Sequence, residues 1–246
     1  MYNWGDTAEK VHGTIEDNRG EFEKVLVILS GGMDSATCLA AAAACSDDVP
    51  GAITFDYGQT HTKENVCARE IGFHFDTDVK TINLNNLAGN FKTALSKDSN
   101  IEIPEGATED VPPTYVPFRN TIMLSIAAGY AESWGYSDIF YGANIVDYSG
   151  YPDCRPSYVD KMNQVLDEHN CEIQIHAPIC YLTKSDVVLL GTELKVPWDL
   201  TWSCYRGGQH ACGKCPSCEY RIKGFSEAGI PDPIVYDTEI EWPIKI

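Results

Sequence analysis

The stretch from Val25 to Leu39 constrains the fold of this chain more than any other, and it reads Val-Leu-Val-Ile-Leu-Ser-Gly-Gly-Met-Asp-Ser-Ala-Thr-Cys-Leu. It predicts a short apolar strand, a glycine turn and then a helix over 36–44. Gly31 and Gly32 permit a close backbone approach, so successive N–H groups can converge on one anion. Ser35 lies at the start of the helix, where unpaired N–H groups and the helix dipole favour negative charge. We therefore predict a phosphate-binding turn.

This turn lacks the Gly-Lys-Ser/Thr ending of a Walker loop, and no lysine within it reaches for a γ-phosphate. Asp34 would repel an anion unless a divalent cation bridges the two, so we expect Mg²⁺ with the phosphates of ATP. Glycines alone would indicate an ordinary strand–turn–helix corner. The complete string resembles the pyrophosphate loop of ATP-pyrophosphatases, with Asp34 and Ser35 as catalytic candidates. The predicted ATP contacts here are Leu29, Ser30, Gly31, Gly32, Met33, Asp34, Ser35, Ala36 and Thr37.

Strands and helices alternate along the rest of the chain. Further strands are predicted over 52–57, 74–84, 139–141 and 172–176. Further helices are predicted after 58–61, ending near 71, and over 119–134, 156–168 and 183–190. This alternation, with the phosphate-binding turn after the first strand, predicts an α/β fold with a doubly wound, mostly parallel, Rossmann-like sheet.

The chain divides into three regions. Residues 1–23 are polar and without clear periodicity, so we interpret them as an N-terminal extension. Residues 24–200 form the predicted α/β domain, and 201–246 form a cysteine-rich C-terminal segment. Within the domain, 85–113 has no strong period, and connections of that length often serve as lids or partner surfaces.

Composition excludes several classes of protein. Of the 246 residues, 43% are hydrophobic, which is enough for a sizeable core. The net charge of −18 weighs against stable nucleic-acid binding. No run is apolar enough to span a membrane and no signal peptide is recognisable, so we expect a cytoplasmic protein without a membrane partner. Without an export signal, the ten cysteines do not indicate a disulfide framework.

Polar side chains lie at the end of the second predicted strand and at the start of the helix predicted from 119. Asp56 and Tyr57 lie at the edge where parallel sheets bind ligands, and a carboxylate there can accept from an adenine amino group or a ribose hydroxyl. Arg119 opposes the helix dipole unless an anion offsets it, so Arg119 and Asn120 are candidate nucleotide contacts and Arg119 a candidate catalytic residue. A strand-end cap for Asp56 and a surface salt bridge for Arg119 are the simpler alternatives.

The stretch over 144–156 is dense in side chains that hydrogen-bond or stack. Aspartates there can accept from a guanine-like edge, tyrosines can stack on a flat heterocycle, and Arg155 can clamp a carboxylate. A polar turn with structural tyrosines is the alternative, but the density favours a small, planar, polar substrate. The predicted substrate contacts are Asn144, Asp147, Tyr148, Tyr151, Asp153 and Arg155.

Four cysteines have the spacing C-x7-C-x2-C-x2-C, at Cys204, Cys212, Cys215 and Cys218. This set suits one tetrahedral zinc per chain, and four thiolates leave no open position, so the metal is expected to be structural. His210 is a substitute ligand that four cysteines make unnecessary. An iron–sulfur cluster is the rival interpretation, because the spacing does not exclude it. Zinc would fold this segment over the mouth of the active site.

Together these motifs resemble one family. The stretches 30–35, 55–59, 115–120, 146–156 and 201–218 are similar to those of 7-cyano-7-deazaguanine (preQ0) synthases, the QueC/ExsB family of the ATP-pyrophosphatase (PP-loop) superfamily. The resemblance runs from about 25 to 233, nearly the whole chain. It implies the adenine nucleotide alpha hydrolase-like fold, a homodimer, and the substrates 7-carboxy-7-deazaguanine, ATP and ammonia.

The resemblance implies a reaction in two activations. Adenylation gives the carboxylate a good leaving group, ammonia forms the amide, and a second ATP activates the amide oxygen so that loss of AMP leaves the nitrile. The phosphate-binding turn with Mg²⁺ would hold pyrophosphate each time. The alternatives are an enzyme that stops at the amide, a tRNA-modifying PP-loop enzyme, and a non-catalytic nucleic-acid-binding zinc module. The intact phosphate-binding turn and the charge of −18 argue against the last.

Overall fold

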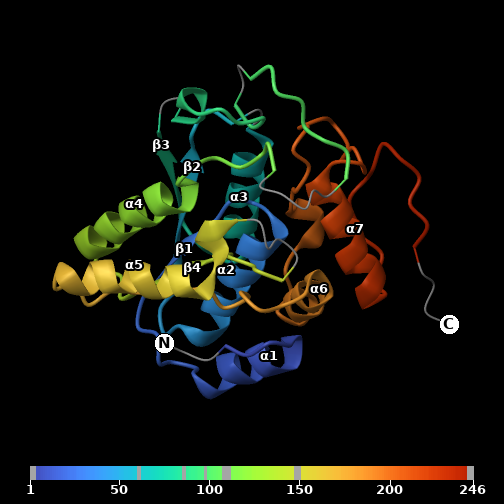
Figure 1. The fold of residues 1–246 in the computed structure, drawn as a ribbon. Helices are drawn as coiled ribbons and strands as arrows, with labels where there is room; N and C mark the ends of the chain where they lie inside the picture. The colour runs from blue at the N-terminus through green and yellow to red at the C-terminus, as the bar shows by residue number, and fades with distance from the viewer. Residues whose placement is uncertain are drawn as a thin grey trace.

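The computed structural model describes residues 4–59, 62–84, 87–96, 99–106, 112–146 and 151–242. Its centre is a parallel sheet with strand order β3-β2-β1-β4-β5 (Figure 1). The strands are β1 (Val25–Ile28), β2 (Gly51–Asp56), β3 (Val79–Asn83), β4 (Asp138–Tyr141) and β5 (Gln174–His176). The α-helices are α1 (Ala8–Asp17), α2 (Met33–Cys45), α3 (Lys63–His74), α4 (Arg119–Trp134), α5 (Pro156–Glu168), α6 (Lys184–Glu193) and α7 (Pro216–Ala228).

Alternate residues of β1 face opposite sides of the sheet, and each side carries its own hydrophobic core. Val25 and Val27 pack with buried residues of α1, α2, α3, α6 and α7. Leu26 packs instead with α4 and α5, which lie side by side on the other face (Figure 1). The predicted doubly wound α/β fold is therefore confirmed.

The order of the strands reverses at β1. Leu26 is paired with Gly51 of β2 on one side and with Ile139 of β4 on the other. The chain first winds outward through β2 and β3, and then returns to build β4 and β5 on the opposite side of β1. Ligands of open parallel sheets bind outside the carboxyl ends of the strands at such a reversal. The predicted phosphate-binding turn leaves β1 at this point.

Helix α2 is buried on nearly all sides, and its alanine-rich sequence explains why. Small side chains allow the helix to approach both the sheet and α6 closely. It begins at Met33, three residues before the predicted start, because Gly32 serves as its N-cap and the Thr37 hydroxyl donates to the Met33 carbonyl at 3.0 Å. Within the described ranges, no helix has the length and apolar character needed to span a membrane.

The N-terminal region contains a helix that the sequence did not predict. In α1, only Val11 and Ile15 are buried, and they lie four residues apart on the face that packs into the core. Trp4 and Phe22 flank the helix, and their rings stack with centroids 5.9 Å apart. Two buried apolar positions in ten are too few for a periodic signal, so residues 1–23 were interpreted as an extension before the first strand.

Two further expectations are corrected by the structure. The strand expected from His74 begins only at Val79, because α3 continues to His74 and a left-handed turn at Asp76 (φ 54°) separates helix from strand. Phe73 and Phe75, one on each side of His74, imitated the alternation of a strand. Helix α7, over Pro216–Ala228, was not predicted, because two of its buried positions, Arg221 and Gly224, add nothing to an apolar periodicity.

Helix α7 is anchored by a fully buried ion pair. The Arg221 guanidinium donates from Nε to Asp232 Oδ2 at 2.6 Å and from Nη2 to Asp232 Oδ1 at 2.9 Å. Both side chains are 0% exposed. Further donations reach Thr201 Oγ1 at 2.7 Å and the Trp198 carbonyl at 3.0 Å, so the guanidinium ties α7 to the segment before the cysteines.

Replacing Asp232 by alanine should therefore lower the free energy of unfolding by about 3–5 kcal/mol, because it leaves a buried charge without its partner. Urea titration followed by circular dichroism measures this. Asp237→Ala is the control, since Asp237 is exposed and pairs with His210 at 3.3 Å. A loss of less than about 1 kcal/mol for Asp232→Ala, the range of exposed pairs, would contradict the assigned role.

Candidate active site

A cavity of about 300 Å³ opens at the carboxyl ends of β1, β2 and β4. Its lining brings together the phosphate-binding turn, the start of α3, the start of α4, the exit of β4, the start of α6 and the C-terminal segment. Among the predicted site residues, those that line it are Leu29, Ser30, Gly32, Met33, Asp34, Ser35, Tyr57, Arg119, Asn120, Asn144 and Tyr151. Gly31, Ala36, Thr37, Asp56, Asp153 and Arg155 are not among its lining residues.

The phosphate-binding turn is held in shape by its two serines. The Ser35 hydroxyl accepts from the Ser30 backbone N–H at 3.1 Å, donates to the Gly32 carbonyl at 3.1 Å and lies 3.0 Å from the Ser30 hydroxyl. Gly32 caps α2 without any side-chain hydrogen bond. The first N–H groups of α2 are therefore left for a ligand, at a helix terminus that favours an anion.

Gly31 is required by both its conformation and its surroundings. Its φ of +84° belongs to the left-handed region, and a Cβ there would lie 2.3 Å from the Glu64 carbonyl oxygen. Its own carbonyl accepts from the Trp202 backbone N–H at 2.8 Å. Gly31 is thus the point where α3 and the C-terminal segment both touch the turn.

Asp34 is paired with a lysine from a distant part of the chain. Lys184 Nζ donates to both carboxylate oxygens of Asp34, at 2.7 and 2.8 Å. The two side chains are 13% and 31% exposed, and both line the cavity. The turn therefore has a lysine beside it after all, supplied by α6 rather than by its own sequence.

Sequence reasoning missed Lys184, although a signal was present. It follows Thr183, the correctly predicted cap of α6, whose hydroxyl accepts from the Asp186 backbone N–H at 3.1 Å in a capping box. A lysine at the first position of a helix opposes the helix dipole, which is the same argument that singled out Arg119. The Asp186 carboxylate also accepts from Ala8 N–H of α1 at 3.3 Å, which ties α1 to the start of α6.

Arg119 faces the cavity rather than the surface. In the described part of the chain, no carboxylate lies within salt-bridge distance of its guanidinium, so the surface salt bridge considered from the sequence is not found there. Burial opposes its charge, but the neighbouring tyrosine hydroxyls, that of Tyr57 foremost, outweigh burial and raise the pKa of Arg119. A cation held by neutral hydroxyls remains available to a phosphate or a carboxylate.

Asn120 and Asp153 contact each other. Asp153 Oδ2 accepts from the Asn120 backbone N–H at 3.3 Å, and the Asn120 side chain donates to the Asp153 carbonyl at 3.4 Å. Asp153 is buried and supplies a carboxylate to the start of α4, whose N-cap, Phe118, makes no side-chain hydrogen bond. The anion that offsets the dipole at this helix is therefore a residue of the chain itself.

The other predicted substrate and nucleotide contacts differ in whether they line the cavity. Tyr151 lines the cavity, and its hydroxyl lies 3.2 Å from the Thr114 hydroxyl. The Asn144 side chain donates to the carbonyls of Ile179 and Leu182 and so braces the loop before α6. Asp56 accepts from Gly58 N–H at 3.4 Å in the turn after β2, and Arg155 is exposed. Asp147 and Tyr148 lie outside the described residues.

Glu64, which sequence reasoning did not select, also lines the cavity. It lies in the first turn of α3, which packs directly on Gly31. Burial raises the pKa of Glu64 to about 7, while the charge of Arg119 opposes that shift. No sequence signal marked this residue, because a glutamate in the first turn of a helix is ordinarily explained by the helix dipole.

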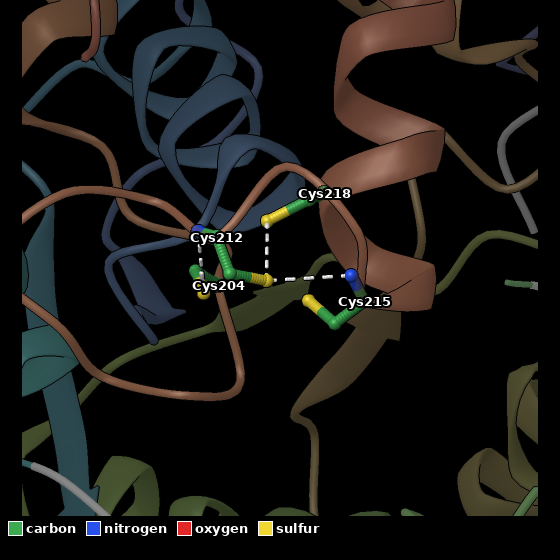
Figure 2. A group of neighbouring side chains, drawn as sticks. All are labelled: Cys204, Cys212, Cys215 and Cys218. Atoms are coloured by element: carbon green, nitrogen blue, oxygen red, sulfur yellow. Dashed lines mark hydrogen bonds between the residues drawn. The ribbon is translucent and has the colours of Figure 1, made fainter. Parts of the chain in front are cut away.

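The four cysteines converge as predicted, and their Sγ atoms all lie within 4.8 Å of one another (Figure 2). Cys212 N–H donates to Cys204 Sγ at 3.4 Å, and Cys215 N–H donates to Cys212 Sγ at 3.3 Å. Thiol contacts lower the pKa of Cys204 and raise that of Cys218, so the four cannot all ionise unaided. A cation that accepts four thiolates fits this cluster. His210 is not part of it.

The cysteine segment is attached at the rim of the cavity. Lys63 Nζ lies 3.2 Å from the centroid of the Trp202 ring and donates to the carbonyls of Gly208 and Gln209 at 3.2 and 2.9 Å. Further residues of the segment line the cavity directly: Ser203, Tyr205, Ser217, Tyr220 and Arg221. The cluster thus fixes one wall of the site.

The fold and the site define a nucleotide-binding α/β protein of the PP-loop class. Among solved structures, the chain is similar to the NMN synthetase from Francisella tularensis, with a TM-score of 0.52, 16% sequence identity, and coverage of 94% of this chain and 88% of that one. At that identity the likeness concerns the fold alone.

Sequence comparison is more specific. Residues 24–229 match the family model described as Queuosine biosynthesis protein QueC. The chain is 48% identical to the 7-cyano-7-deazaguanine synthase of Thermoplasma acidophilum, over 88% of this chain and 93% of that protein. It is 46% identical to the protein of the same name from Oceanobacillus iheyensis, over 87% and 98%. The chain belongs to the QueC family, as its motifs indicated.

Proposed function

We propose that this chain is a 7-cyano-7-deazaguanine synthase, an ATP-dependent enzyme that forms carbon–nitrogen bonds on the route to queuosine. The main support for this function is that relatives of this name match nearly the whole chain at 42–48% identity. A phosphate-binding turn that opens into a cavity at the reversal of the sheet supports the same reaction class. The substrates are 7-carboxy-7-deazaguanine, ATP and ammonia.

The chemistry rests on positioning and on charge. A carboxylate is a poor acylating agent, and transfer of AMP to it supplies a good leaving group. The unpaired N–H groups at the start of α2 bind the departing pyrophosphate, and Lys184, 2.7 Å from Asp34, adds a positive charge beside it. After ammonia has formed the amide, the same groups serve the second ATP, whose AMP leaves with the amide oxygen. The product is the nitrile.

The remaining cavity residues bind the two flat molecules. Arg119 and Tyr57 lie together between the turn and α4, where an anionic group of either substrate fits a charged guanidinium. Tyr151 and Tyr205 also line this space, and an aromatic ring can stack on a planar heterocycle. We retain Asp56, Asn120, Asn144, Asp147, Tyr148, Asp153 and Arg155 as proposed contacts of the nucleotide and the substrate.

We propose that the protein binds two metals. Mg²⁺ bound with ATP offsets phosphate charge, and Asp34, a carboxylate that lines the cavity at the turn, would hold it. Zinc is the proposed occupant of the cysteine cluster, with one ion per chain. An absorption spectrum of the purified protein separates zinc from the iron–sulfur alternative, since zinc is colourless and an iron–sulfur cluster is not.

We also propose a homodimer, which the family resemblance implies, and a location in the cytoplasm. Light scattering of the purified chain tests the dimer. Stable nucleic-acid binding is not expected at a net charge of −18. A tRNA-modifying activity is tested by offering unmodified tRNA with Mg-ATP. AMP formation that depends on tRNA, and not on 7-carboxy-7-deazaguanine, would replace the proposed function.

A further inference from the structure

Glu64 has no part in the mechanism above, yet it occupies a central place in the cavity. Its backbone carbonyl packs against Gly31, so its side chain starts beside the phosphate-binding turn and lines the same space. The other carboxylate at the turn, that of Asp34, has both oxygens on Lys184. In the described part of the chain, no lysine, arginine or histidine nitrogen lies within salt-bridge distance of Glu64.

Beside the phosphate-binding turn, a carboxylate is poorly suited to contact the phosphates of ATP. Its charge repels phosphates, and its lone pairs add no hydrogen-bond donor for pyrophosphate or for the substrate carboxylate. It suits a small cation. Mg²⁺ is assigned above to Asp34, and among the remaining reactants only ammonia has a cationic form, because ammonium is its dominant state near neutral pH.

We infer that Glu64 binds ammonium in the cavity and accepts the proton that must leave before nitrogen can attack. This inference rests on the proposed function and adds to it a catalytic residue for the nitrogen-transfer step. A base is most effective when its pKa lies near the working pH, and burial raises the pKa of Glu64 to about 7. The same proton transfer would take place in the cavity that Arg119 and Tyr57 line.

Ammonium gives one proton to the Glu64 carboxylate, and the lone pair released on nitrogen attacks the acyl carbon of the adenylate. The carbon–nitrogen bond forms, and the carbon–oxygen bond to AMP breaks with its electron pair on the AMP phosphate. The nitrogen then loses a second proton to solvent, which leaves the neutral amide. Glu64 returns its proton to solvent before the next turnover.

Glu64→Gln in the full-length protein tests this inference, because the amide keeps the size of the side chain and removes the base. Two reactions are followed with 7-carboxy-7-deazaguanine: ATP–pyrophosphate exchange without ammonium, which reports adenylation, and amide formation with ammonium. We expect exchange to stay within about twofold of wild type, while kcat/KM for ammonium falls by about 10²-fold or more. Glu70→Gln, an exposed change on the same helix, is the matched control.

Hydroxylamine supplies the decisive readout. It is already neutral near pH 7, so it attacks the adenylate without a base, and Glu64→Gln should form the hydroxamate at close to the wild-type rate. Equal losses with ammonium and hydroxylamine would overturn the inference, as would reduced exchange with a raised Mg²⁺ requirement, which would make Glu64 a metal ligand. Unchanged kcat/KM for ammonium would also overturn it. Absence of exchange in wild type would instead refute the proposed function.

Discussion

Lys184→Met should lower the rate of ATP–pyrophosphate exchange by about 10²–10³-fold, which is the typical effect of removing one preorganised charge-stabilising group. Lys184 Nζ lies 2.7 and 2.8 Å from the two carboxylate oxygens of Asp34, at the edge of the turn where pyrophosphate leaves. Without the lysine, the leaving group loses a nearby cation and meets the unpaired charge of Asp34. Exchange of labelled pyrophosphate into ATP, with 7-carboxy-7-deazaguanine present, measures the loss.

Raising the Mg²⁺ concentration in the Lys184→Met variant separates two explanations for that loss. If Lys184 only neutralised Asp34, saturating Mg²⁺ would take over that role and restore exchange, whereas a direct role toward pyrophosphate leaves the variant slow at every Mg²⁺ concentration. We expect no restoration. Lys161→Met, an exposed change on α5, is the control for loss of a lysine alone. Full restoration would reduce Lys184 to a counterion of Asp34.

Cys215→Ser should remove the bound metal and lower the melting temperature by more than about 10 °C. Cys215 is fully buried, and all four sulfurs lie within 4.8 Å of one another, so three thiols without the fourth leave an incomplete tetrahedron around the ion. The loss of stability extends to the phosphate-binding turn, because the Trp202 backbone N–H of the same segment donates to the Gly31 carbonyl at 2.8 Å. Elemental analysis and calorimetry measure the two effects.

The control for this change is Cys171→Ser, which alters a cysteine outside the cluster and should keep both metal and melting temperature. Activity gives a third readout, since displacement of the cysteine segment removes one wall of the cavity. A metal-free Cys215→Ser protein with unchanged melting temperature and full turnover would contradict a structural role for the cluster.

Local chemistry was predictable from the sequence wherever the residues concerned are close together in the chain. The phosphate-binding turn, the cap at Thr183 and the four cysteines each combine geometry and chemistry within a few residues. The alternation of strands and helices likewise determined the doubly wound sheet. Each of these predictions depended on patterns whose physical cause is local.

Long-range pairing was not predictable in the same way. Lys184 meets Asp34 across 150 positions, and only the packing of α6 against α2 brings them together. Asn120 and Asp153 were assigned to different ligands, yet they bond to each other. Glu64 reaches the site because α3 packs on Gly31, a contact that depends on the whole sheet. Residue types indicated the chemistry, but tertiary packing decided which groups remain available for ligands.

The most direct test of the proposed function is mass spectrometry of the products formed from 7-carboxy-7-deazaguanine, Mg-ATP and an ammonium salt by the purified, metal-loaded chain. The proposal predicts 7-cyano-7-deazaguanine, with two AMP released for each nitrile. Amide as the final product, with one AMP, would mean an enzyme that halts after the first activation. If neither product forms and AMP does not accumulate, the assigned substrate is wrong.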